Sequence, residues 1–565
     1  MEKSAVYHLG DSIYSFPVSP TKARIRLRTK RDDTIKQVNI IWNTQHKFWT
    51  ERLSTPMEIK YTDSMFDYYQ ADLDNGMPGY TYLFEIIETD GSVWYYNESG
   101  FDSKIYLTTT FEDNFMVVFP NENDVVYPNK AFDGRIFYQI FPERFARGEH
   151  STIDKSYITM DWNTEEPRND QFAGGDLVGI TEKLPYLKKM GIGAIYLNPI
   201  HPSISAHKYD IDDYFDVDKM FGSLADLKTL VDTAHSMDIK IVMDLVFNHS
   251  SYYNPIFQDV VKNGKNSKYY DWYFVYGDKP VYEKCNYNTF CEVPMMPKLN
   301  TNNPKVQQYL ASVGEFYARD YGVDGFRLDV AFDVSHDFWR YFRKKLLAIN
   351  PDIYIVGEFW QNSHSFLGAD QWDSTMNYPL QYGCKRYLVS NRYNASQLAD
   401  FLNGALMRYK DATNQNMLNL LDSHDTPRFF TMVGENEKLY LMGIAILMFY
   451  KGSPMIYYGT EILMNGEQDP YNRKCMRWDS PMYNSDEHKV ILHLLNLRAN
   501  SDVLKYGEIS VYSKDDLFYI TRTLDGQSIT LAVNNSAESK LVSGISYGYN
   551  IDGNVMLPKS FAILK

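Results

Sequence analysis

Eight short apolar runs, most of them followed by a segment of helical periodicity, occupy the middle of the chain. They cover residues 136–141, 194–199, 240–247, 325–330, 353–358, 374–378, 417–422 and 455–459. Segments such as 223–237, 304–322 and 336–349 lie between them and repeat apolar residues every three to four positions, which indicates helices. Eight buried strands alternating with helices predict a (β/α)8 TIM barrel, an α/β fold whose active site lies at the carboxyl ends of the strands.

Regions rich in β-branched and aromatic residues flank the predicted barrel. Residues 1–120 contain strand-like runs separated by Asp, Asn, Gly and Pro, which predict an N-terminal β-sandwich. We expect the catalytic barrel over 121–501 and a C-terminal β-domain, a second sandwich, over 502–565. The third strand is followed by a long insertion, 250–303, and because loops of this length are usually functional we expect it to form one wall of the cleft.

The composition argues against several kinds of partner. The 565 residues carry 57 basic and 72 acidic side chains, a net charge of -15, so neither nucleic acid nor an anionic membrane is expected as a partner. No window approaches 18 uninterrupted apolar residues, and the first residues lack the apolar core of a signal peptide. We therefore expect a cytoplasmic protein, unless a signal peptide has been removed. Four cysteines without zinc-site spacing predict reduced thiols.

Polar residues recur at the ends of four predicted strands. They are Asp244, Asn248 and His249 after the third, Arg327 and Asp329 on the fourth, Glu358 on the fifth, and Asp422, His424 and Asp425 after the seventh. A lone strand-end Asp is more often a helix cap, and an Arg–Asp pair is often only structural. Four strand ends of one barrel indicate a shared site instead.

Two kinds of chemistry use such groups. A metal-dependent hydrolase commonly has closely spaced His ligands, and the chain contains no HxH or HExxH motif. Glycoside hydrolysis needs two carboxyl groups across the scissile bond. Arg327 and Asp329 share one face of a strand, so the guanidinium is expected to favour an ionised nucleophile. Glu358, in the apolar run IVGEFW, suits the acid, which must be protonated.

Four motifs carry a family resemblance. DLVFNH (244–249), GFRLDVA (325–331), GEFW (357–360) and LLDSHD (420–425) resemble, in order, the four signature regions of the α-amylase family, glycoside hydrolase family 13. MPKLN (296–300) and IFYQIFPERF (136–145) resemble the neopullulanase, cyclomaltodextrinase and maltogenic amylase subfamily. Residues 5–30 resemble the start of its N-terminal starch-binding-type module, so the resemblance covers nearly the whole chain.

The resemblance implies a role for each site residue. Asp329 is the implied nucleophile, Glu358 the general acid/base, and Asp425 a third carboxylate that binds sugar hydroxyls. The implied substrate-binding residues are Arg327, His249 and His424 at the glucose that is attacked, Tyr209 stacking on it with His207 beside it, Asp469 and Arg473 on the donor side, and Phe290, Trp360 and Tyr378 as acceptor-side aromatic platforms. For each of those three aromatic residues, ordinary packing remains the alternative.

Two departures from the family pattern bear on specificity and on metal binding. The subfamily's usual VANE is here VAFD (330–333), which places Phe332 where Asn is usual and leaves linkage preference open. The calcium loop, often FANGD, reads FARGE, so Arg147 stands where an oxygen ligand is expected, although Gly174 and Asp176 match later ligands. Since calcium needs clustered oxygens, we expect no metal at this site and no required cofactor, with calcium as the alternative.

The sequence thus predicts a retaining α-glucan hydrolase that cleaves α-1,4 bonds in cyclodextrins, pullulan, starch and malto-oligosaccharides, with transglycosylation and some α-1,6 tolerance. An exo-acting α-glucosidase or glucan transferase of the same family, and a non-catalytic glycan-binding barrel, remain alternatives. The presence of all three carboxylates argues against the last. The resemblance also implies a homodimer whose N-terminal module narrows the neighbouring cleft.

Overall fold

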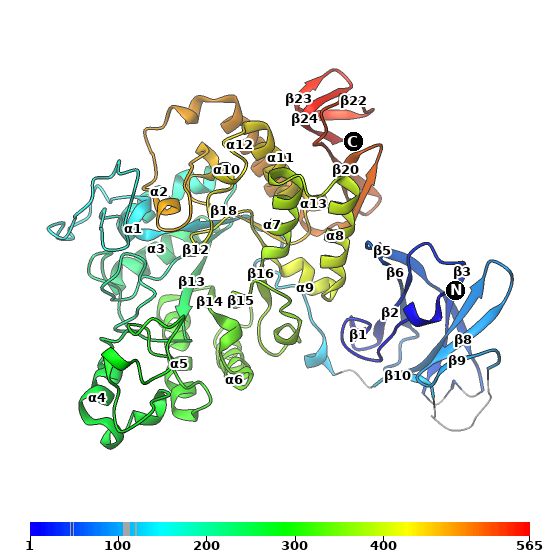
Figure 1. Cartoon of the computed structure of the whole chain (residues 1–565), viewed down its shortest axis with the longest axis horizontal. Coiled ribbons are helices and arrows are strands. Elements are labelled where there is room, and N and C mark those ends of the chain that lie inside the picture. Colours follow the sequence, from blue (N-terminus) through cyan, green and yellow to red (C-terminus); the bar gives the residue numbers. More distant parts are fainter. Residues whose placement is uncertain (46, 49, 106–112, 119–120) are drawn as a thin grey trace. The chain divides into compact units, whose positions relative to one another are not determined.

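The structure, a computed structural model, describes residues 1–45, 47–48, 50–105, 113–118 and 121–565 (Figure 1). The chain forms two compact units. The first comprises Met1–Pro128, Tyr393–Asn414 and Val511–Ser513, and the second Asn129–Arg392, Gln415–Ser510 and Lys514–Lys565. No helix among these described residues is long and apolar enough to cross a membrane.

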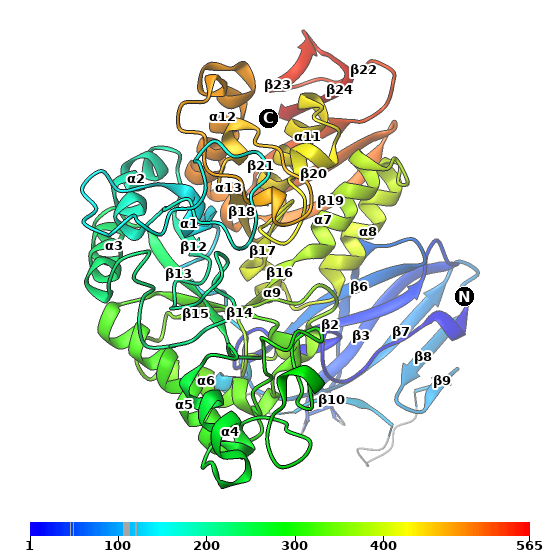
Figure 2. The same cartoon turned by 60° about the vertical axis from the view of Figure 1, so that its left-hand side comes forward.

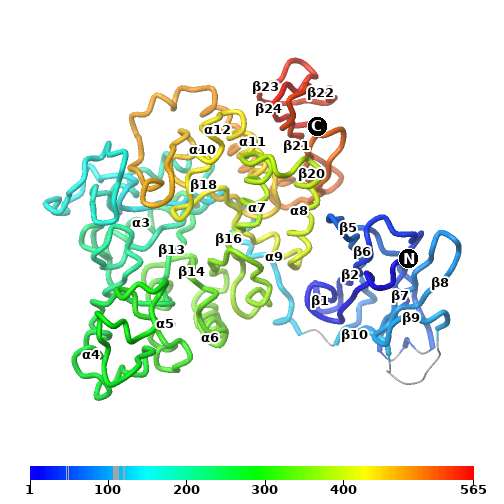
Figure 3. The backbone as a smooth tube through the Cα atoms, viewed as in Figure 1, coloured from blue at the N-terminus to red at the C-terminus, as the bar shows by residue number. Residues whose placement is uncertain are grey.

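The N-terminal part of the first unit is a β-sandwich, drawn in blue in Figure 3. One sheet has the order β1 (Ser15–Pro17), β2 (Lys22–Lys30), β6 (Phe66–Asp74), β5 (Glu58–Thr62). The other has the order β4 (Leu53–Pro56), β3 (Ile35–Thr44), β7 (Tyr80–Glu88), β8 (Val93–Asn97), β9 (Gly100–Asp102), with β10 (Phe115–Val117) on β7. Alternate residues of β2 and β3, among them Ile25, Leu27, Val38 and Ile40, are buried in one core, which confirms the predicted sandwich. Its predicted end at residue 120 lies outside the described residues.

Eight parallel strands of the second unit close into a barrel (Figure 2). They are β11 (Phe137–Ile140), β12 (Ala194–Leu197), β13 (Lys240–Val246), β14 (Gly325–Asp329), β15 (Tyr354–Gly357), β16 (Ser374–Asn377), β17 (Leu418–Asn419) and β18 (Ser453–Tyr457). The last strand pairs with the first through Phe137 and Met455, so no edge is left open. Every strand overlaps one of the eight predicted runs, and the predicted TIM barrel is confirmed.

Helices follow the strands on the outside of the barrel. Figure 2 shows α2 (Leu177–Lys189), α3 (Leu224–Ser236), α5 (Pro304–Phe316) and α6 (His336–Leu347) outside β12 to β15. The helix α3 illustrates why these segments are helical. Ser223 and Asp226 form a capping box at its start, and Leu227, Leu230 and Val231 bury one face. Further along the second unit lie α7 (Tyr378–Cys384), α11 (Glu437–Phe449) and α12 (Asp486–Asn500).

The interior of the barrel is filled by side chains. Tyr196, Val242, Val356, Met376 and Met455, each from a different strand, belong to one buried cluster. A filled interior leaves polar strand-end residues only the mouth of the barrel to occupy. The insertion between β13 and α5 carries α4 (Pro255–Asn263) and ends in paired segments joined by the bridges Thr289 to Pro297 and His249 to Lys298.

The C-terminal strands form an antiparallel β-domain. Its strands are β19 (Glu508–Lys514), β20 (Leu517–Leu524), β21 (Gln527–Asn534), β22 (Lys540–Leu541), β23 (Ile545–Asp552) and β24 (Val555–Leu564). In the described residues, β20, β21, β24 and β22 follow one another in one hydrogen-bonded sheet, and β23 also pairs with β24. This confirms the expected C-terminal β-domain.

Candidate active site

A cavity of about 360 Å³ opens at the carboxyl ends of the barrel strands. Ten of the thirteen predicted site residues line it, namely His207, Tyr209, His249, Phe290, Asp329, Glu358, Trp360, Asp425, Asp469 and Arg473. Phe290 comes from the insertion, which therefore forms part of the wall, as expected. Another cavity of about 450 Å³ borders residues 134–136 and 191–193, just before β11 and β12, and none of its described lining residues is a predicted site residue.

Arg327 contacts carboxyl groups from four barrel strands beneath this cavity. Strand register places it level with Asp244 on β13, and its side chain is wholly buried. Its Nη1 donates to Asp329 Oδ1 at 2.8 Å and to both carboxylate oxygens of Asp244 at 3.2 Å. Its Nη2 lies 3.1 Å from Glu358 Oε2 and 3.8 Å from Asp425 Oδ2. One guanidinium thus faces four carboxyl groups.

Glu358, the residue after β15, is held by neighbouring N–H groups. The backbone N–H of Val330 donates to Glu358 Oε2 at 2.9 Å, and Trp360 Nε1 donates to Oε1 at 3.0 Å. Val330 has a φ of 44°, in the left-handed region that β-branched residues rarely adopt, at a cost of about 1–3 kcal/mol. This turn at the end of β14 directs its N–H to Glu358, so the strained residue positions the carboxyl group.

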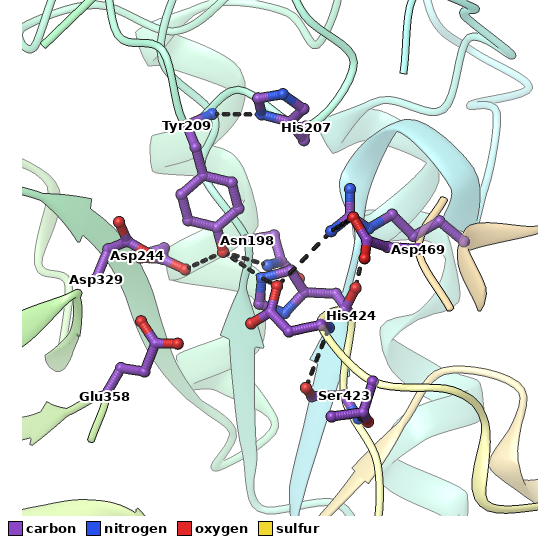
Figure 4. Close-up of polar contacts among 12 residues, drawn as sticks. Asn198, His207, Tyr209, Asp244, Asp329, Glu358, Ser423, His424 and Asp469 are labelled. Atoms are coloured by element: carbon purple, nitrogen blue, oxygen red, sulfur yellow. Dashed lines mark hydrogen bonds and ion pairs between the residues drawn. The ribbon is translucent and has the colours of Figure 1, made fainter. Parts of the chain in front are cut away.

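Tyr209 is the centre of a second network (Figure 4). Its hydroxyl donates to Asp244 Oδ2 at 2.8 Å, accepts from Asn198 Nδ2 at 2.9 Å and lies 2.6 Å from His424 Nε2. Its ring stacks on that of His424, with centroids 5.4 Å apart and planes 6° apart. Because Gln139 Nε2 donates to His424 Nδ1, the imidazole donates from Nε2 and is neutral. Burial and the nearby charge of Arg327 lower the pKa of His424 well below its ordinary value, consistent with that state.

The carboxyl groups share too little positive charge for all of them to ionise. Burial raises the pKa of Asp329 well above its ordinary value, because Arg327 offsets only part of it and the carboxylates of Glu358 and Asp244 act in the same direction. Burial, and then the charge of Glu358, raise the pKa of Asp425 to about 7. Arg327 lowers the pKa of Asp329, as expected from the sequence, but it does not offset the burial, since this guanidinium divides its charge among several partners. These two raised pKa values favour a proton shared within the carboxyl cluster near neutral pH.

Two known families match most of the chain. The family described as "Alpha amylase, catalytic domain" matches residues 139–493, and "Alpha amylase, N-terminal ig-like domain" matches residues 1–119. The first match spans more than half of the chain and contains every predicted site residue. The chain belongs to the α-amylase family. This α-amylase family member is accordingly a glycoside hydrolase.

Individual relatives agree with that assignment. The α-amylase family member is 37% identical to neopullulanase 2 of Thermoactinomyces vulgaris, over 95% of this chain and 92% of the relative. It is 35% identical to the intracellular maltogenic amylase of Bacillus subtilis strain 168, over 98% and 94%. A solved structure of a cyclomaltodextrinase matches with a TM-score of 0.92 and 32% identity, covering 100% of both chains.

Three predicted substrate-binding residues lie behind the lining of the cavity in this α-amylase family member. Arg327 and His424 are buried, and they contact residues that line the cavity, Arg327 through Asp329 and Glu358 and His424 through Tyr209. Tyr378 is 0% exposed and lies against Trp360, with ring centroids 3.9 Å apart and planes 9° apart. The prediction that Tyr378 is itself a platform is therefore wrong, because the Trp360 indole covers it. Tyr378 supports that indole, which remains partly exposed.

The cavity also contains residues that the sequence prediction missed. Asn169, Met296 and Val330 line it in addition to the ten predicted residues. Met296 lies in the motif MPKLN and Val330 in GFRLDVA, so these motifs could have indicated both residues. Asn169 lies in no motif, and the structure explains its place because its Oδ1 accepts from Arg473 Nη1 at 3.3 Å.

The loop that resembles the family's calcium site does not fit a divalent cation. Lys155 Nζ donates to the carbonyl of Gly174 at 3.0 Å and to Asp176 Oδ2 at 2.6 Å. Arg147 Nε donates to the carbonyl of Ala173 at 2.7 Å. The other oxygen of the buried Asp176 accepts the N–H of Gly179 at 2.7 Å at the start of α2. Since ammonium and guanidinium groups already bind these oxygens, we derive no step through a metal.

Proposed function

We propose that this chain is a retaining α-glucan hydrolase of the neopullulanase, cyclomaltodextrinase and maltogenic amylase type. One observation carries the proposal. Asp329 and Glu358 end adjacent strands, line the same cavity and contact the same guanidinium of Arg327. Two carboxyl groups beside one sugar bond are what retaining glycoside hydrolysis requires.

The reaction proceeds in two displacements. Asp329 attacks the anomeric carbon of the bound glucose while Glu358 gives its proton to the glycosidic oxygen, and the leaving sugar departs. The resulting glycosyl ester on Asp329 is then attacked by water, whose proton passes to Glu358. Two inversions retain the anomeric configuration. Arg327 neutralises Asp329 when the ester bond breaks.

The remaining lining residues bind the sugar. Burial lowers the pKa of His249 to about 3 and that of His207 to about 4, so both imidazoles are neutral hydrogen-bonding partners for hydroxyl groups. Asp425 lies 3.0 Å from His424 Nε2 and supplies carboxylate oxygens to the same glucose. Phe290, whose ring stacks on His249 at 4.9 Å, and Trp360 offer apolar faces to sugar rings.

The substrate class follows from the relatives' names. Relatives called neopullulanase, cyclomaltodextrinase and maltogenic amylase support pullulan, cyclodextrins and starch-type glucans as substrates. Cleavage of α-1,4 bonds, also in malto-oligosaccharides, transglycosylation and some α-1,6 cleavage are part of the proposal. One of them is named intracellular, which supports a cytoplasmic location. We also retain a homodimer and the domain limits 1–120, 121–501 and 502–565 as part of the proposal.

Product analysis tests this function. β-Cyclodextrin, pullulan and starch are digested at matched concentrations, and the products are separated by chromatography, with the anomer followed by NMR. We expect maltose from β-cyclodextrin with retained α-configuration. We also expect that Asp329→Asn has unchanged thermal stability at acidic pH and shows no turnover. Glucose as the sole product would favour an exo-acting α-glucosidase, and unchanged turnover by Asp329→Asn would refute the nucleophile. Light scattering in the same buffer tests the homodimer.

A further inference from the structure

A cavity of about 450 Å³, which we call the amino-end cavity, lies at the ends of the barrel strands opposite to the catalytic carboxyl groups. Residues 134–136, 191–193 and 238 line it and come just before β11, β12 and β13, and its volume suits a small molecule. The chain has a net charge of -15, yet the described lining holds five cations and only two carboxyl groups. They are Lys130, Arg135, Lys188, Lys189 and Lys505, with Asp133 and Asp238. This local excess of positive charge on an acidic protein favours an anionic ligand.

Three of the cations in the amino-end cavity are available to a ligand. The exposed ones that form no ion pair with any described residue are Lys130, Lys188 and Lys189. The other two cations are already engaged. Arg135 Nη2 donates to Asp238 Oδ1 at 2.9 Å, and Lys505 Nζ lies 3.8 Å from Asp502 Oδ1 on the short helix α13 (Asp502–Tyr506). The positive charge that a ligand meets therefore comes mainly from the three available lysines.

Asp133, the remaining carboxyl group of the described lining, offsets little of this charge. Burial raises its pKa, and a hydrogen bond from Gln415 and the charges of Arg498 and Arg522 offset only part of that rise. Arg498 on α12 and Arg522 on β20 are wholly buried and donate to backbone carbonyls, among them that of Gly507 at 2.7 Å, and no described carboxylate pairs with either. Burial disfavours both charges, but a guanidinium keeps its proton at neutral pH. Unpaired positive charge thus also lies behind the lining.

The kind of cation in the cavity favours a phosphate group over a carboxylate. A carboxylate pairs best with the two-pronged guanidinium of an arginine, but the Nε and both Nη atoms of Arg135 already donate to backbone carbonyls and to Asp238. An ammonium is a compact point charge, so several lysines can surround one phosphate group. Tyr506, which is 47% exposed, and the amides of Asn496 and Asn500 also line the cavity and offer an apolar ring face and hydrogen-bonding groups to a hydroxylated ligand.

We infer that the amino-end cavity binds a phosphate group, either as free phosphate or as part of a phosphorylated sugar. Lys130, Lys188 and Lys189 supply the ammonium groups that contact the phosphate oxygens. Asp329 and Glu358 lie at the other end of the barrel, so the ligand does not compete with an α-glucan for the catalytic cavity. The inference does not depend on the proposed reaction.

The test removes the available lysines and measures binding to the full chain. Glucose 6-phosphate, inorganic phosphate and citrate are each titrated calorimetrically at pH 7.5 and constant ionic strength, and the unfolding midpoint is measured with each of them. We expect the triple variant Lys130→Gln, Lys188→Gln, Lys189→Gln to bind glucose 6-phosphate or phosphate about tenfold more weakly and to hydrolyse β-cyclodextrin like the wild type. The matched control is Lys36→Gln, Lys262→Gln, Lys305→Gln, which removes the same charge at exposed positions outside the cavity and is expected to keep the wild-type affinity. Because Lys188 and Lys189 also interact favourably with the carbonyl end of α2, affinity rather than the stability of the free variant is the readout.

The two phosphate probes distinguish the sources of the ligand. Tighter binding of glucose 6-phosphate would identify a phosphorylated sugar, and equal or tighter binding of inorganic phosphate would identify free phosphate, so both results support the site. Three results would overturn it. They are no binding heat and no rise in the midpoint with either probe, the same affinity in the cavity variant as in the control variant, and citrate binding as tightly as the phosphate probes. Absence of α-glucan turnover by the wild type would overturn the proposed function and leave this inference standing.

Discussion

Asp425 connects the chemistry of the site to the stability of the fold. Its side chain is 26% exposed, lies 3.8 Å from Arg327 and 3.6 Å from Arg473, and belongs to a group of carboxyls that outnumber those cations. Burial, and then the charge of Glu358, raise its pKa from 3.8 to about 7. We predict that Asp425→Asn makes the protein relatively more stable as the pH rises.

Proton linkage gives the sign and the size of the predicted change in unfolding free energy with pH. A carboxyl group whose pKa is raised by folding contributes stability that is complete below its unfolded pKa and is lost as the pH rises through its folded pKa. The change from 3.8 to about 7 corresponds to about 4 kcal/mol of unfolding free energy, and about two thirds of this is lost between pH 5 and pH 8.5. A quarter of the side chain reaches solvent and its neighbours share the charge. We therefore expect roughly half of this pH-dependent loss of unfolding free energy, about 1–2 kcal/mol. Asn carries no charge and avoids this loss.

The assay is thermal unfolding of wild type and Asp425→Asn across that pH range. We expect the midpoint of the variant to rise relative to the wild type by about 2 °C between pH 5 and pH 8.5, given the entropy of unfolding of a domain this large. Asp525→Asn, at an exposed turn position with a φ of 48° that Asn tolerates, is the matched control and is expected to show no such trend. A difference that stays constant with pH, or falls as pH rises, would refute the reasoning.

Two further perturbations test other parts of the structure. Lys155→Met leaves a buried oxygen of Asp176 without its ammonium partner, so we expect a loss of about 2–4 kcal/mol, seen as a lower unfolding midpoint. EDTA is expected to leave the wild-type midpoint unchanged, and a clear fall with EDTA would show that a metal holds this loop. Gly357→Ala places a Cβ 2.4 Å from the Trp372 ring, so we expect a loss of about 1–3 kcal/mol and at least tenfold lower kcat because the adjacent Glu358 moves. An unchanged kcat would contradict this placement of Glu358.

The barrel could be predicted because its determinants are local. Each strand is buried on both faces and reads as an apolar run, and each helix buries one face at regular spacing. The seventh strand shows the limit of that reasoning, since the run 417–422 contains only the two-residue β17. Beyond it Asp422 accepts the N–H of Phe429 at 2.7 Å, at the start of the short helix Phe429–Met432. Asp422 therefore caps a helix, which is the structural role expected of a lone strand-end Asp.

The site could be predicted only as far as the motifs reach. The spacing of Arg327 and Asp329 placed both side chains on one face, as the structure confirms. The contacts of Arg327 with Asp244 and Glu358 depend on the register of neighbouring strands, which no local pattern encodes. The pairing of Lys155 with Asp176 likewise spans a loop. The sequence therefore indicated the cation Arg147 at this site but not the second cation, Lys155.

The sharing of Arg327 among several carboxyl groups has opposite effects on folding and on catalysis. In the free protein burial, and after it the charge of neighbouring carboxylates, raises the pKa values of Asp329 and Asp425, which costs stability at neutral pH and above. In the transition state the anomeric carbon becomes oxocarbenium-like and carries positive charge, so the same excess of negative charge stabilises it. A more stable Asp425→Asn variant is therefore expected to be a poorer catalyst, because the charge that destabilises the fold is the charge that the transition state needs.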